Sequence, residues 1–137
     1  MDRANSPTSR LATLVIWITA FTYLGFAVWL GTRPNALLEL FEIQDRTTAM
    51  NTEIRAFYGG IEAGIAGAMF ILWLRKQVWS ALLIGGLPLL FSAMGRGLGM
   101  LVDGYSGTHA ILAAAELTGA AICLITMLQN DSSETSI

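Results

Sequence analysis

Three ionisable residues, Glu62, Arg96 and Glu116, stand inside long stretches of otherwise apolar sequence. A charge at the centre of a bilayer costs at least about 2.5–3.5 kcal/mol, so in membrane-spanning helices such residues should face inward and be neutralised. Two carboxylates and one guanidinium can form a structural ion-pair network that fixes the register of the helices. The same groups can instead line a polar pocket that binds a proton, a cation or a small ligand. The residue types leave both interpretations open.

Five further polar residues lie toward the ends of the same stretches and complete the set of candidate ligand- or proton-binding residues: Glu53, Arg55, Tyr58, Asp103 and His109. Arg55 and Glu62 are seven positions apart, a spacing that places two residues on one side of a helix. We expect Arg55 to pair with Glu53 at a helix mouth. Asp103 stands near a helix C-terminus, where the dipole disfavours a negative charge. It therefore needs a cation beside it, and the candidates are Arg55, Arg96 and His109. We otherwise place His109 at the rim of the bundle.

Counting residues excludes several kinds of chemistry. The single cysteine, Cys123, excludes an internal disulfide and the quinone-linked disulfide chemistry of some small membrane enzymes. The single histidine cannot supply the paired axial ligands of a membrane cytochrome b. The net charge of -2 offers no basic surface for nucleic acid. No P-loop, dinucleotide fingerprint or Ser-His-Asp order occurs, and Arg96 would repel a cation from the nearby carboxylates. We therefore predict no catalytic residue, no metal site and no cofactor, and we do not expect an enzyme.

The composition indicates that lipid is the main solvent of the chain. Hydrophobic residues make up 54% of the 137 residues, charged residues only 13%, and the mean hydropathy is +0.58, whereas soluble domains have about 25% charged residues. Crossing a bilayer takes about 20 apolar residues, and four stretches suffice: residues 11–32, 54–74, 79–102 and 108–128. Residues 1–10 and 129–137 are polar and are predicted to be disordered tails. Residues 35–43 suit either a short interfacial helix or a loop with buried leucines.

Short connections between the last three stretches require antiparallel neighbours. The predicted fold is therefore all-α, an antiparallel four-helix bundle that is integral to a membrane. Four spans place both termini on one side. The basic residues of that side are Arg3, Arg10, Arg75 and Lys76, and those opposite are Arg33 and Arg46, with Arg55 if it lies at the helix mouth. Because loop Lys and Arg favour the cytoplasm, we predict that both termini are cytoplasmic.

The three inner charges share one depth. Glu62 and Glu116 lie eight residues after the starts of their stretches, and Arg96 lies seven residues before Asp103 at the end of its own. At about 1.5 Å per residue, all three are expected roughly 10–12 Å below one surface. One arginine stabilises one carboxylate well but hardly two. We therefore predict that the two glutamates share a proton near neutral pH, with Arg96 within reach of both.

Small residues beside these charges predict close packing of helices. In lipid, glycines four positions apart let two helix backbones approach each other. We expect four such glycines at helix–helix contacts: Gly60, Gly64, Gly95 and Gly99.

The segment Glu53-Ile-Arg-Ala-Phe-Tyr-Gly-Gly60, followed by Glu62 and Gly64, resembles the signature of a family of small bacterial membrane proteins catalogued as domain of unknown function 4345. Further elements of the resemblance are Gly95-Arg96, Gly99, Asp103-Gly104 and Glu116. The resemblance spans residues 11–128 and implies a four-span bacterial membrane protein. We expect this protein in the bacterial cytoplasmic (inner) membrane. The signature residues that it implies are Glu53, Arg55, Tyr58, Gly59, Gly60, Arg96, Gly99 and Asp103. It implies no activity.

Two classes of function remain. The first is a non-enzymatic membrane protein, either an accessory or scaffold subunit or a bundle that binds a small hydrophobic or polar molecule in its outer half. The alternative is a small proton-coupled transporter, which would act as a homo-oligomer because four helices are few for a transport path. A carrier site is usually marked by a broken helix, and the one candidate, Gly85-Gly86-Leu-Pro88, lies in the other half of the bundle. The expected partners are the lipid bilayer and a small molecule or protein that the sequence does not identify.

Overall fold

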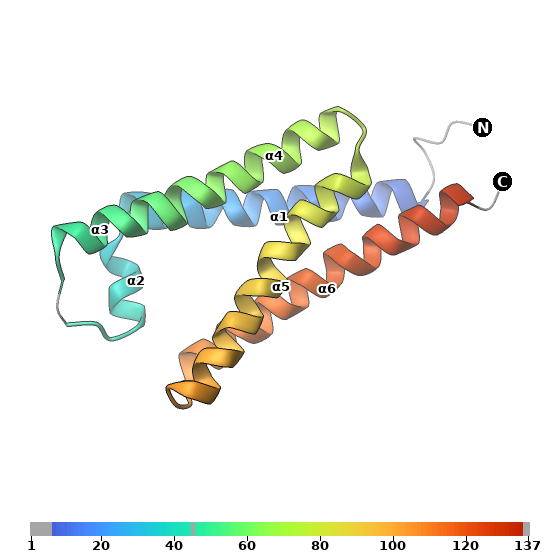
Figure 1. Cartoon of the computed structure of the whole chain (residues 1–137). Helices are drawn as coiled ribbons and strands as arrows, with labels where there is room; N and C mark the ends of the chain where they lie inside the picture. Colours follow the sequence, from blue (N-terminus) through green and yellow to red (C-terminus); the bar gives the residue numbers. More distant parts are fainter. Residues whose placement is uncertain (1–6, 45, 136–137) are drawn as a thin grey trace.

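The computed structural model describes residues 7–44 and 46–135, and within these ranges every regular element is a helix (Figure 1). The elements are α1 (Pro7–Thr32), α2 (Asn35–Leu40), α3 (Thr48–Ile54), the π-helix η2 (Arg55–Ile61), α4 (Glu62–Leu74), α5 (Val78–Val102) and α6 (Gly107–Thr135). Because α3, η2 and α4 follow one another without a break, they form one long rod. Four helices are long and apolar enough to cross a membrane: Arg10–Thr32, Thr48–Leu74, Val78–Val102 and Gly107–Asn130. The predicted all-α, four-helix membrane fold is confirmed.

Three helix boundaries lie further out than the sequence pattern suggested. The rod begins at Thr48 because the Thr47 side chain accepts a hydrogen bond from the Met50 amide at 3.2 Å, an N-cap that the apolar run does not reveal. Helix α1 begins at Pro7, where a proline loses no hydrogen bond. Helix α6 continues to Thr135, since adding a residue to an existing helix costs little. The disorder predicted for residues 1–6 and 136–137 lies outside the described residues.

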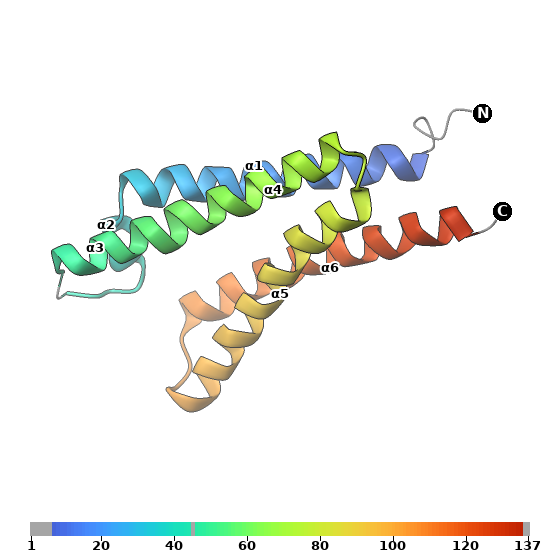
Figure 2. The same ribbon diagram turned by 45° about the horizontal axis from the view of Figure 1, so that its top comes forward.

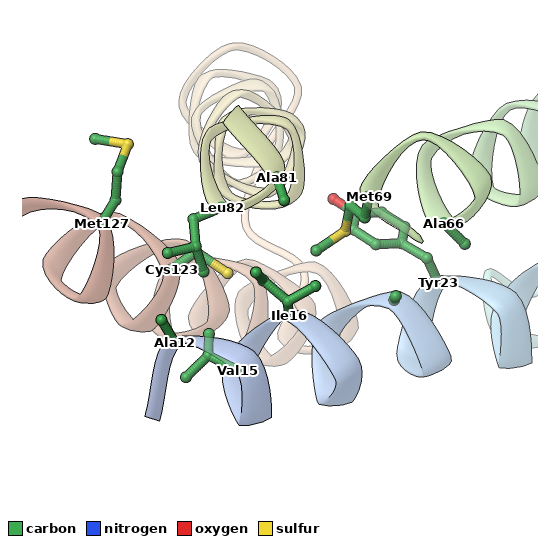
Figure 3. Packing of buried hydrophobic residues seen from close by; sticks show 11 residues of the cluster. Ala12, Val15, Ile16, Tyr23, Ala66, Met69, Ala81, Leu82, Cys123 and Met127 are labelled. Atoms are coloured by element: carbon green, nitrogen blue, oxygen red, sulfur yellow. The ribbon is translucent and has the colours of Figure 1, made fainter. Parts of the chain in front are cut away.

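The helices form two pairs that diverge along the bundle. Helix α1 runs beside the rod and α5 runs beside α6, and the two pairs spread apart away from the chain termini (Figures 1 and 2). Near the termini all four spans share one apolar core (Figure 3). Its fully buried side chains include Ile16 of α1, Met69 of α4, Leu82 of α5 and Cys123 of α6. The bundle is therefore held together mainly at this end, which we call the packed half.

The opposite end, which we call the splayed half, has a smaller core of its own. This core joins Leu30 of α1, Leu37 and Leu38 of α2 and Ile54 of α3, and α5 and α6 contribute nothing to it among the described residues. Residues 35–40 form a short helix and not an irregular loop. Leu37 and Leu38 are buried in it, with 8% and 2% of their surface exposed. The two pairs of helices thus bury their apolar faces separately here.

The prediction that Gly60, Gly64, Gly95 and Gly99 lie at helix–helix contacts is wrong. A Cβ atom built on Gly64 or Gly95 would meet nothing within 4 Å, and one on Gly60 or Gly99 would meet only atoms of its own chain segment. The glycines that permit close packing of helices lie elsewhere, at Gly31, Gly59, Gly85, Gly86 and Gly119. The reason is orientation: Gly60, Gly64 and Gly95 are exposed on outward faces of their helices, whereas Gly59 on the same rod faces Gly31 of α1.

Helix α5 remains continuous through Pro88, although proline removes one backbone donor from the helix. The carbonyl oxygen of Gly85, three residues earlier, accepts a hydrogen bond of 3.0 Å from the buried hydroxyl of Tyr23 on α1. This contact joins the two helix pairs within the packed half, through Tyr23 of its apolar core.

Candidate functional site

An ion pair between Arg96 of α5 and Glu116 of α6 forms the centre of the splayed half. The Arg96 Nε lies 2.9 Å from Oε2 and 3.1 Å from Oε1 of Glu116, and the Ser92 hydroxyl donates to Oε1 at 2.8 Å. The Arg96 and Glu116 side chains are 16% and 17% exposed. Both charges are therefore compensated within one pair of helices. Ser92 was missed as a candidate, although its position one turn before Arg96 was a usable signal.

His109 joins the same cluster from the first turn of α6. Its Nδ1 lies 3.0 Å from Nη1 of Arg96. A guanidinium can only donate hydrogen bonds, so Nδ1 accepts and the ring proton of the neutral imidazole resides on Nε2. The structure thus places His109 inside the charged cluster and not apart at the rim.

Phe41, which directly follows α2, covers this cluster from the other helix pair. Its ring stacks on His109 with centroids 4.6 Å apart and an angle of 17° between the planes. The Arg96 Cζ atom lies 5.9 Å from the Phe41 ring centroid, a cation–π distance. The aromatic ring therefore links the two helix pairs across the splayed half. No pattern in the sequence signals this role for Phe41.

Glu62 stands apart from the ion pair. It is the first residue of α4 and lies seven residues before Met69, so within this regular helix it shares the inward face of that core residue. Its side chain is half-buried, and its Oε2 atom is buried without a hydrogen-bond partner among the described residues. Arg96 pairs with Glu116 and Arg46 pairs with Glu39, and neither ion pair includes Glu62. Arg96 therefore does not reach both glutamates, because Glu62 belongs to the other, divergent pair of helices.

The remaining candidates lie outside this cluster. Arg55 does not pair with Glu53: its Nε donates to the carbonyl oxygen of Gly31 at 3.2 Å. Asp103 is exposed at the end of α5 and has no ion pair within the described residues. Tyr58 packs against the small apolar core of α1, α2 and α3. The structure thus brings together Arg96, Glu116 and His109, and it separates the other candidates from them.

The π-helix η2 explains why the spacing argument failed for Arg55. A π-helix has wider turns than an α-helix and occurs often at functional sites. Seven residues along it do not return to the same face, so Arg55 points to the end of α1 whereas Glu62 faces inward. The two adjacent glycines, Gly59 and Gly60, were the only sequence signal for an irregular turn. At Gly59 the rod also approaches α1 closely: a Cβ atom on it would lie 3.2 Å from Gly31 Cα.

No group of three or more metal-ligating side chains gathers within residues 7–44 and 46–135. The chemistry that the described arrangement offers is one compensated ion pair, one neutral imidazole and one carboxylate without a partner. Such a set can hold a proton or accept hydrogen bonds from a ligand.

The comparisons with known proteins identify a family and assign no activity. No curated protein and no solved structure matches the chain. The family model described as "Domain of unknown function (DUF4345)" matches residues 11–127, which cover most of the chain and reach into all four candidate spans. The chain is therefore a member of the DUF4345 family, built as a multi-pass bundle of four apolar helices.

Proposed function

We propose that the protein is a non-enzymatic membrane bundle that binds a small molecule between its two helix pairs in the splayed half. The observation that carries this proposal is the buried Oε2 atom of Glu62, which has no hydrogen-bond partner among the described residues. A buried acceptor without a partner costs free energy, and a ligand that donates a hydrogen bond removes this cost.

The surroundings of Glu62 restrict the chemistry of the ligand. The charge of Arg96 is already compensated by Glu116, so no free cation is available for an acidic ligand. The remaining acceptor favours a ligand with an amine or a hydroxyl group. The apolar faces of diverging helices favour an apolar body on the same molecule.

Mass spectrometry of molecules that copurify in mild detergent tests this proposal. We expect a bound molecule in the wild type and in Glu53→Gln, which removes an exposed carboxylate from the same rod. The molecule should be lost from Glu62→Leu. Glu62→Gln separates the two ligand classes, because an amide oxygen still accepts from a hydroxyl but no longer neutralises an ammonium group. Identical small-molecule profiles for the wild type and Glu62→Leu would contradict the proposal.

The alternative is a small proton-coupled transporter that acts as a homo-oligomer. It is supported by the same lone carboxylate, because a Glu62 that carries the proton alone needs no cation beside it. In this hypothesis Glu62 alone carries the proton, in place of the predicted proton shared between Glu62 and Glu116. An infrared band of a protonated carboxyl group that disappears in Glu62→Gln, together with proton flux into proteoliposomes, would favour transport. A band without flux would favour the binding bundle.

We further propose that the chain resides in the bacterial cytoplasmic membrane with both termini in the cytoplasm, on the basis of its basic residues. Reporter fusions after Ile137 and next to Gln44 test this orientation. A periplasmic signal from the fusion after Ile137 would reverse it.

A further inference from the structure

A pocket of about 400 Å³ opens at the end of the splayed half, among the C-terminal end of α1, helix α2 and the start of the rod. Its lining residues include Trp29, Arg33, Glu39, Asn51 and Arg55. The pocket lies apart from the Arg96–Glu116 ion pair, since it contains no residue of α5 or α6 among the described residues.

Two guanidinium groups give this pocket a positive character. Arg33 is exposed and has no ion pair within the described residues. Arg55 uses its Nε to hold the Gly31 carbonyl oxygen at 3.2 Å, which anchors the side chain and leaves its terminal nitrogens for a ligand. The acidic lining residue, Glu39, is compensated by Arg46 at 3.1 Å. Two cationic side chains with unused donors therefore face one cavity.

Asn51 adds a second, independent feature. Its Oδ1 atom is buried and has no hydrogen-bond partner among the described residues. An amide beside two guanidinium groups can accept from a hydroxyl or ammonium group while the arginines bind an anion. Trp29, at the end of a candidate span, is the residue type that marks the headgroup level of a bilayer.

We infer that this pocket binds a phosphate ester, either the headgroup of a phospholipid or a soluble phosphate compound, through Arg33 and Arg55. Arginine binds phosphate with paired, charge-assisted hydrogen bonds. The Asn51 acceptor favours an ester that carries a hydroxyl or amine group, as glycerol phosphate does. This inference does not depend on ligand binding at Glu62.

Native mass spectrometry of the full chain in detergent, titrated with phosphatidylglycerol, tests the lipid source. The matched lipid is a monogalactosyl diacylglycerol with the same acyl chains and no phosphate. We expect preferential binding of phosphatidylglycerol to the wild type, reduced roughly tenfold in Arg33→Gln and further in Arg33→Gln/Arg55→Gln. Arg75→Gln, which removes an exposed charge at the other end of the bundle, should bind as the wild type does.

Thermal-shift titrations with glycerol 3-phosphate and inorganic phosphate test the soluble source. A soluble ester is supported if glycerol 3-phosphate stabilises the wild type but not Arg33→Gln, and if the wild type shows no preference for phosphatidylglycerol. Arg33 makes no ion pair within the described residues, so Arg33→Gln should fold normally and remain informative if the double variant does not. The inference would be overturned if Arg33→Gln bound each of these compounds as well as the wild type does.

Discussion

The packed half and the splayed half of the bundle use the same four helices in opposite ways. In the packed half, small and apolar side chains from all the spans meet around Met69, Leu82 and Cys123, which are fully buried (Figure 3). In the splayed half the pairs separate, and the contacts between them are polar or aromatic, through Arg96, His109 and Phe41. The difference indicates that stability resides at one end, whereas the groups that can accept a ligand or a proton lie at the other.

The two glutamates of the splayed half should separate most clearly. We expect Glu116→Gln to lower stability by roughly 3 kcal/mol, because removing one partner of a buried ion pair leaves the other charge uncompensated. Glu62→Gln should leave stability unchanged or raise it, because its carboxylate has no ionic partner to lose within the described residues. Thermal unfolding of both variants in the same detergent measures the contrast. Similar losses in both would mean that Glu62 shares Arg96 after all.

Glycine substitutions test the packed half against the splayed half. A Cβ atom on Gly86 would lie 3.0 Å from Cys123 Cβ and 3.2 Å from Leu124 Cγ. We expect Gly86→Leu to cost at least about 1–3 kcal/mol through overpacking. Gly95→Leu, on the same helix but with open space at its Cβ, should melt close to the wild type. Equal destabilisation would show that the diverging helices close on one another in detergent.

Phe41→Ala tests the aromatic link between the helix pairs. Loss of the stacked ring should cost about 0.5–1.5 kcal/mol beyond the buried area, and it should release α2 more than the packed core. Hydrogen exchange of the α2 amides is the measurement, and the amides of α5 near Leu82 serve as the internal reference. Unchanged protection of α2 would mean that Leu37 and Leu38 alone hold this helix.

The smallest effect is expected at the surface ion pair. The Arg46 and Glu39 side chains are 40% and 61% exposed, and exposed pairs contribute about 0–1 kcal/mol. Arg46→Gln should therefore shift the melting temperature much less than Glu116→Gln, and the shift should vanish at high salt. A loss as large as that of Glu116→Gln would mean that the loop after α2 is essential to the bundle.

Much of the architecture could be predicted from the sequence, for a physical reason. Long apolar runs must span a bilayer as helices, because their backbone groups find no other hydrogen-bond partners in lipid. The short connections at Arg75 and Asp103 then fix antiparallel neighbours. The inward position of Arg96 and Glu116 follows from the cost of exposing charges to lipid.

The sequence by itself thus determined the helices and which charges avoid lipid, because both depend on local composition. Only the tertiary structure decided which side chains contact one another. The divergence of the helix pairs leaves Glu62 without Arg96, the packing of α5 leaves Gly95 on an exposed face, and the π-helix directs Arg55 to Gly31. Phe41 and His109 are far apart along the chain, and no local pattern encodes their stacking. These contacts depend on the angle between helices, which is set by the sum of the packing contacts and not by any single motif.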